Sequence, residues 1–70
     1  MRSFILHALK KKYEGQIASA RANVEVYLQS PVGIGEHADI VGSIDSQVAL
    51  IAEAQEKLLI ISNIILELKE

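Results

Sequence analysis

The sequence predicts an all-α fold: an antiparallel helical hairpin that pairs with a second copy to form a homodimeric four-helix bundle. Three observations support this prediction. Two long segments repeat apolar residues every three or four positions, as an amphipathic helix does. One stretch containing proline and two glycines separates the segments. The second segment also carries more apolar surface than one neighbouring helix covers.

The composition describes a single small domain, residues 1–70. Half of the residues are apolar, the formal net charge is −2, and cysteine is absent, which excludes a disulfide framework and thiolate metal sites. The apolar content argues against a disordered chain. A chain of 70 residues scarcely builds a core, so we expect no enclosed catalytic pocket and predict a protein that is not an enzyme and needs no cofactor.

The first predicted helix covers residues 3–28. Its apolar residues are spaced 3, 4, 4, 3, 4 and 3 apart, which is a helical period and not the alternation of a strand. This stripe consists of Leu6, Leu9, Tyr13, Ile17, Ala20, Val24 and Tyr27. Gly15 lies inside the helix and costs about 1 kcal/mol relative to alanine, which weakens the helix without ending it.

The predicted loop covers residues 29–37. Pro31 cannot continue a helix and disfavours helical backbone at Ser30, and Gly33 and Gly35 free the backbone for a reversal. A loop of about nine residues is ordinary between packed helices, which then run antiparallel.

The second predicted helix covers residues 38–68. Its stripe is Ile44, Val48, Ile51, Ala54, Leu58, Ile61, Ile65 and Leu68. Asp39 and Asp45 fall in its early turns, where carboxylates complement the positive end of the helix dipole. A break at Gly42, with Ser43 as a new N-cap, is the alternative, but the apolar pattern keeps its phase and favours one continuous helix.

Folding about residue 33 predicts that residue i lies beside a residue of about 67 − i. Residues 1–28 hold five basic and two acidic side chains, whereas residues 38–70 hold two basic and six acidic ones, so the two arms attract each other. The predicted ion pairs are Lys11 with Glu56, Arg21 with Asp45, and Arg2 with Glu67.

The carboxyl-terminal half of the second helix is apolar on nearly every side, Ile60 and Leu66 included. One helix cannot cover all of these side chains. Each one left in water loses the roughly 1.5–3 kcal/mol of stabilising free energy that its burial would contribute. We therefore predict self-association, with a third element supplied by a different protein as the alternative. The predicted oligomer interface comprises Leu58, Leu59, Ile61, Ile64, Ile65 and Leu68.

The loop and the start of the second helix hold the candidate partner-contact residues, which are Ile34, Glu36, His37 and Asp39. Carboxylate oxygens and imidazole suit zinc or manganese, which would make a metal-dependent enzyme a further hypothesis. Yet one short loop rarely directs three ligands at one ion. We favour a rigid loop in which Ile34 closes the end of the bundle and polar residues cap the helix, and predict no metal.

A basic segment of the first helix supplies the candidate nucleic-acid contacts, which are Lys10, Lys11, Lys12 and Arg21. A weak nucleic-acid-associated module is therefore the alternative function. The lysines lack interleaved arginine or aromatic residues and the chain is acidic overall, so a solvated helix face is favoured.

Three segments together, Ala22–Leu28, Pro31–His37 and Asp39–Val41, resemble short uncharacterised helical proteins encoded by phages of marine cyanobacteria and related environmental sequences. The resemblance covers roughly Ala20–Glu56, about half of the chain. Relatives often carry proline where this sequence has Ala38, which loosens the predicted start of the second helix. The resemblance implies a phage origin, and a phage-encoded adaptor that binds a host or virion protein would fit a protein that acts through helix packing. It implies no activity and no site residues.

We therefore expect a non-enzymatic interaction or structural protein that acts through helix packing. The most apolar run, residues 58–68, has about half the roughly 20 residues that a membrane span needs, so no membrane span is predicted. The expected location is the cytoplasm, of the host cell if the protein is phage-encoded, with virion association left open.

Overall fold

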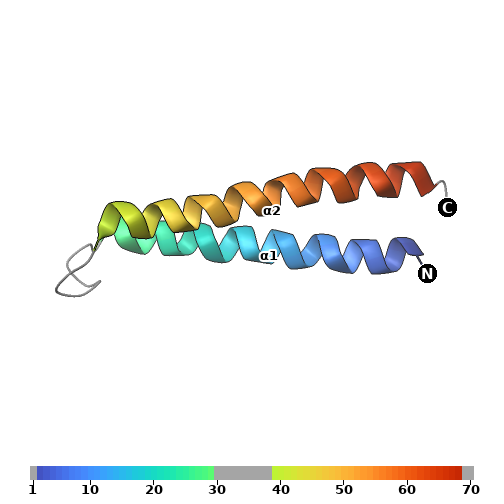
Figure 1. The fold of residues 1–70 in the computed structure, drawn as a ribbon. Helices are drawn as coiled ribbons and strands as arrows, with labels where there is room; N and C mark the ends of the chain where they lie inside the picture. Colours follow the sequence, from blue (N-terminus) through green and yellow to red (C-terminus); the bar gives the residue numbers. More distant parts are fainter. Residues whose placement is uncertain (1, 30–38, 69–70) are drawn as a thin grey trace.

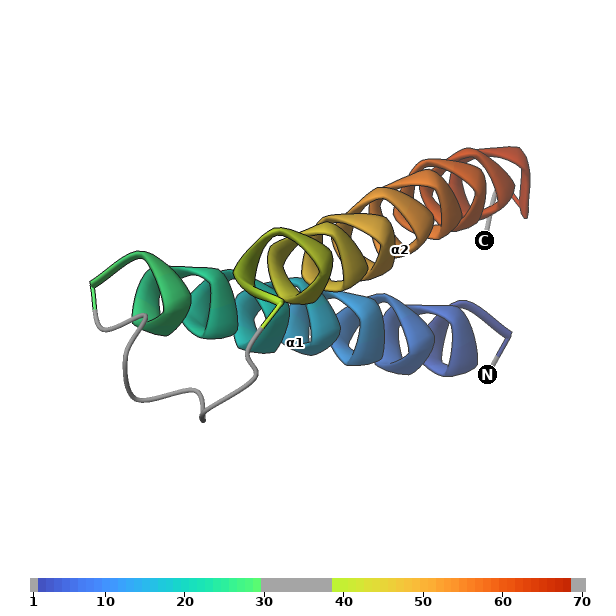
Figure 2. The ribbon, with the colours of Figure 1, turned by 60° about the vertical axis from the view of Figure 1, so that its left-hand side comes forward.

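Two long helices make up the fold. The computed structural model describes residues 2–29 and 39–68. They form α1 (Arg2–Gln29) and α2 (Ile40–Leu68). The helices run antiparallel and side by side, so that Arg2 and Leu68 lie at one end, called here the terminal end (Figure 1). Gln29 and Ile40 lie at the other, the loop end. From a second direction the two helix axes are inclined to each other (Figure 2). The predicted all-α hairpin is confirmed.

The inward side of α1 is the one that the sequence predicts. All seven residues of the predicted stripe are buried or half-buried, between Leu6 and Tyr27. Ser3 and Lys10 are half-buried as well, so inward residues recur from Ser3 to Tyr27 in alternating steps of three and four. This period of 3.5 residues is typical of helices that coil gently around each other.

The inward side of α2 differs from the prediction at one position. Val48 is 50% exposed, and Gln47 is half-buried in its place. With Gln47 included, the inward residues alternate in steps of three and four from Ile44 to Leu68. Placing Val48 on the stripe was wrong because a four-residue step there breaks the alternation that keeps the stripe facing α1.

The core of the single hairpin is thin. Among the described residues, the buried apolar side chains are Ala20, Ala54 and Ile61, at 2%, 1% and 5% exposure. Two alanines at the centre let the helix backbones approach closely. Most of the other inward residues remain half-exposed.

Asp39 begins α2 as its N-cap. Its Oδ1 accepts a hydrogen bond of 2.9 Å from the backbone N–H of Gly42, and its carbonyl oxygen accepts one of 2.8 Å from Ser43. The bond to Oδ1 satisfies one of the N–H groups that a helix start leaves unpaired, and the bond to the carbonyl oxygen is the first backbone hydrogen bond of the helix. The helix is continuous through Gly42 and Ser43, as favoured. It starts at Ile40, two residues later than predicted.

The register of the hairpin is fixed by two contacts across the helices. Asn23 Nδ2 donates a hydrogen bond of 3.0 Å to Gln47 Oε1, and Lys57 Nζ lies 5.0 Å from the centre of the Tyr13 ring. Both contacts pair residue i with residue 70 − i. The predicted register is therefore wrong by three residues, almost one helical turn.

The register error follows from the helix ends. Gln29 was predicted in the loop, but it is the last residue of α1. The midpoint between Gln29 and Ile40 lies between residues 34 and 35, beyond the predicted pivot. The shift separates Lys11 from Glu56, and Lys11 Nζ instead lies 3.5 Å from Glu14 in its own helix. The ion pair of Glu53 with Lys57 likewise lies within one helix, α2.

Candidate interaction surface

The hairpin has two broad sides. In a repeat of 3.5 residues, the residue just before each inward residue lies on one side of the helix pair and the residue just after it lies on the other. We call the side formed by residues just before the inward positions the groove face, because an open groove runs along it. The side formed by residues just after the inward positions is the reverse face.

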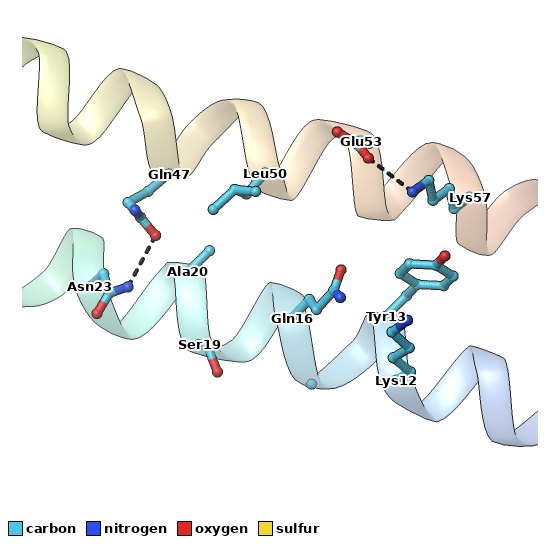
Figure 3. A pocket seen from close by; sticks show the side chains of 11 residues that line it. Lys12, Tyr13, Gln16, Ser19, Ala20, Asn23, Gln47, Leu50, Glu53 and Lys57 are labelled. Atoms are coloured by element: carbon cyan, nitrogen blue, oxygen red, sulfur yellow. Dashed lines mark hydrogen bonds and ion pairs between the residues drawn. The ribbon is translucent and has the colours of Figure 1, made fainter.

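The groove crosses the middle of both helices (Figure 3). Small residues on α1 and amides on both helices form much of its lining. The lining residues are Lys12, Tyr13, Gly15, Gln16, Ser19, Ala20, Asn23, Gln47, Leu50, Glu53 and Lys57. The groove is open to solvent, and amide, hydroxyl and charged side chains lie along it beside Tyr13 and Leu50.

One charged cluster lies at the end of the groove. Lys57 Nζ is 2.9 Å from Glu53 Oε1 and lies over the Tyr13 ring, and Lys12 Nζ lies 5.7 Å from the centre of the same ring (Figure 3). The hydrogen bond and the charge of Lys57 lower the pKa of Glu53. The hydrogen bond to Glu53 raises the pKa of Lys57, with smaller contributions from the Glu53 and Tyr13 charges. The cluster ties α2 to α1.

The predicted oligomer interface divides between two environments. Ile61 is buried, and Leu58, Ile65 and Leu68 lie half-buried on the inward side. Leu59 lies exposed on the reverse face. Ile64 lies exposed on the groove face together with Ile60, and Leu66 lies on the reverse face with Leu59.

The reverse face carries a second apolar stripe that the sequence interpretation missed. Its members are apolar residues, some large and some small, and all of them are exposed. They are Phe4, Ala18 and Leu28 on α1, and Val41, Val48, Ala52, Leu59 and Leu66 on α2. The members on α2 are spaced 7, 4, 7 and 7 residues apart, a helical period that could have been found by searching beside the main stripe.

The candidate partner-contact residues lie mostly beyond the part of the chain that is described. Ile34, Glu36 and His37 fall outside residues 2–29 and 39–68. Asp39 is described, and its carboxylate caps α2 through the Gly42 N–H. Within the described ranges, no group of three or more His, Asp or Glu side chains is placed to hold a metal ion.

The candidate nucleic-acid residues do not form one surface. Lys12 lines the groove, whereas Lys11 is paired with Glu14 and lies on the reverse face. Lys10 is half-buried on the inward side. Arg21 follows the buried Ala20, which places it on the reverse face.

No family model matches the chain, and neither curated proteins nor solved structures match it. The resemblance to cyanobacterial phage proteins therefore stays a prediction. Neither described helix has a stretch both long and apolar enough to cross a lipid bilayer.

Proposed function

We propose that this protein is a non-enzymatic interaction protein that acts by helix packing, and that it self-associates so that two hairpins form a four-helix bundle. One observation carries the proposal. Among the described residues, three apolar side chains are buried and two of them are alanines, while eleven large apolar side chains are exposed. A core this thin offers little to offset the conformational entropy that folding removes.

The surface area of the chain supports the proposal quantitatively. A compact monomer of this mass exposes about 4,330 Å², whereas this chain exposes 5269 Å². The excess of about 940 Å² is close to the roughly 800 Å² that each partner contributes to a protein–protein interface of standard size. One additional hairpin is therefore enough to cover it.

A second copy is the simplest partner that supplies two more helices. Closed dimers with two-fold symmetry are the commonest oligomers of soluble proteins. The charges also suit it, because α1 carries five basic and two acidic side chains and α2 carries one basic and four acidic ones. An α1 helix of one copy is thus attracted to an α2 helix of another.

Sedimentation equilibrium at several micromolar concentrations tests this proposal. We expect a mass of twice 7.7 kDa and a helical circular dichroism spectrum. A helical, cooperatively folding monomer under the same conditions would contradict self-association. Folding that depends on a different protein, such as a host or virion protein, would also contradict self-association.

The alternative of a nucleic-acid-associated module has weaker support. A duplex or single strand is held by a contiguous basic stripe. Here Lys10, Lys11 and Lys12 point to different sides of α1, and Lys11 is already paired. A gel-shift titration at low salt decides this alternative, and we expect no retention of DNA or RNA.

A further inference from the structure

We propose that self-association is centred on the terminal end of the hairpin, where one uncharged segment meets the same segment of a second copy. We call residues 3–9 of α1 and 58–66 of α2 the terminal segment (Figure 1). The two stretches lie side by side, since residue i of α1 lies beside residue 70 − i of α2. This inference rests on the proposed self-association and gives the contact a position along the rod and an alignment of the copies.

The terminal segment is rich in exposed large apolar side chains. It makes up about a quarter of the described residues but contains six of the eleven side chains of this kind. Three lie on each face: Ile5, Ile60 and Ile64 on the groove face, and Phe4, Leu59 and Leu66 on the reverse face. The enrichment therefore does not depend on which face another copy covers.

The same segment contains no Asp, Glu, Lys or Arg. Charged residues begin directly beyond it, at Arg2 and Lys10 on α1 and at Lys57 and Glu67 on α2. Charged residues are depleted from the buried centres of protein interfaces and occur around their rims. The terminal segment therefore has the composition of an interface centre with a charged rim on either side.

The remainder of the rod, residues 10–29 and 39–57, is a poorer centre for the contact. Its five exposed large apolar side chains lie among polar and charged groups. Arg21, Glu25 and Asp45 lie on the reverse face, and the groove holds amides and the Glu53 carboxylate. Covering such groups removes their water, which is unfavourable unless each group finds a new partner.

A second copy suits the terminal segment because a two-fold contact can set the segment against itself. No like charges are then opposed within it. The opposite alignment would set the apolar side chains of each terminal segment against the polar and charged remainder of the other copy. We therefore place the terminal ends of the two copies together.

The like charges of the loop end do not oppose this alignment. Glu25 and Asp45 lie at the same level of the hairpin, so they would repel the same two residues of a second copy that lay close there. That level is 16 positions beyond Leu9, or about 24 Å along the helix. Both carboxylates stay in water when the contact is centred on the terminal segment.

Two matched double variants test the position of the contact. Leu59→Arg with Ile60→Arg changes one residue on each face of the terminal segment, and Val48→Arg with Leu50→Arg does the same outside it. The four side chains are exposed by 50% to 63%, and both variants add the same charge. We expect the first to raise the dimer dissociation constant more than about 100-fold and the second less than about fivefold. Sedimentation equilibrium gives both constants.

The outcomes separate this inference from the proposed function. A monomeric wild-type protein overturns both. A wild-type dimer that the two double variants weaken equally, or not at all, overturns the position of the contact and leaves self-association intact. Greater weakening by the Val48 and Leu50 substitutions has the same meaning.

Energy transfer between fluorescent labels tests the alignment in a dimer whose apolar residues are unaltered. Ala8 and Ala22 are exposed and lie on the outer side of α1, opposite its inward side. The chain has no native cysteine, so Ala8→Cys and Ala22→Cys each give one labelling site. We expect more efficient transfer from Ala8→Cys to Ala8→Cys than to Ala22→Cys, because the second pair is displaced by about 21 Å along the rod. Equal efficiencies, or the reverse order, would overturn the alignment.

Discussion

The side-chain amide of Asn23 donates a 3.0 Å hydrogen bond to the side-chain oxygen of Gln47 across the two helices. Gln47 occupies an inward position of α2 that would otherwise hold an apolar residue. A polar residue at such a position stabilises one axial alignment of two helices over others, because a shift by one turn leaves it without its partner. The pair therefore selects the observed register.

Removing this hydrogen bond should reveal coupling between its two residues. In a cycle of Asn23→Ala, Gln47→Ala and the double variant, we expect a coupling energy of about 0.5–1 kcal/mol. Chemical denaturation measures it. A second cycle with Ser19→Ala in place of Asn23→Ala is the control, since no hydrogen bond between Ser19 and Gln47 is present. Equal coupling in the two cycles would contradict a role for the amide pair.

Gly15→Ala should stabilise the hairpin. A Cβ atom at Gly15 meets no atom within 4 Å, so alanine enters without strain. Alanine is a better helix former than glycine by about 1 kcal/mol. We expect the free energy of unfolding to rise by up to that amount, as measured by urea denaturation. A loss of stability would mean that the backbone at Gly15 is needed for a close contact.

Gly42→Ala should gain less than Gly15→Ala, although both glycines lie in helices. A Cβ atom at Gly42 collides with the Asp39 carboxylate that caps α2. The carboxylate must rotate away, which weakens the cap and offsets the gain in helix propensity. In an Asp39→Ala background the conflict is absent, and the same substitution should recover the larger gain. Identical gains in both backgrounds would contradict this explanation.

Asp39→Ala should itself destabilise the hairpin. The Oδ1 atom of Asp39 accepts the Gly42 N–H, and loss of an N-cap acceptor costs about 0.5–2 kcal/mol. Asp39→Asn retains an oxygen at the same place, so it should keep most of the stability. Thermal unfolding followed by circular dichroism compares the two variants. Equal losses would indicate that the charge, and not the cap geometry, matters.

The sequence predicts the fold well where one strong pattern is present. The stripe from Leu6 to Tyr27 and the reversal after α1 follow from local preferences alone. Gln47 and Val48 show the limit of that approach. Hydropathy favours the valine on the inward side, but the helix phase and the hydrogen bond to Asn23 place the glutamine there. Which of these two residues lies on the inward side depends on the neighbouring helix, and the sequence of α2 alone does not show that helix.

The interaction surface is harder to predict than the fold. The apolar run near Leu59 and Ile60 is evident from sequence, but its division between two opposite faces depends on the inward phase of α2. The apolar stripe on the reverse face, which includes Val41 and Val48, was missed because Val48 was assigned to the inward stripe of the second helix. The predicted register, which is wrong by three residues, also fails to place Ala18 and Ala52 at the same level along the hairpin. The observed register places them there.

The Glu53–Lys57 pair should make stability depend on pH at both extremes. Lowering the pKa of Glu53 below 4.5 gives stability that is present above that value and is lost as pH falls through the lowered pKa. Raising the pKa of Lys57 above 10.5 gives stability that is present below that value and is lost as pH rises through the raised pKa. We therefore expect Glu53→Gln to lower Tm most between about pH 5 and 10, and least outside that range.

Because both side chains are partly exposed, 1 M salt should shrink the effect of Glu53→Gln on Tm. Glu56→Gln, in the same helix but outside this pair, is the control, and a difference for Glu53→Gln that is constant with pH would contradict the ion pair's contribution.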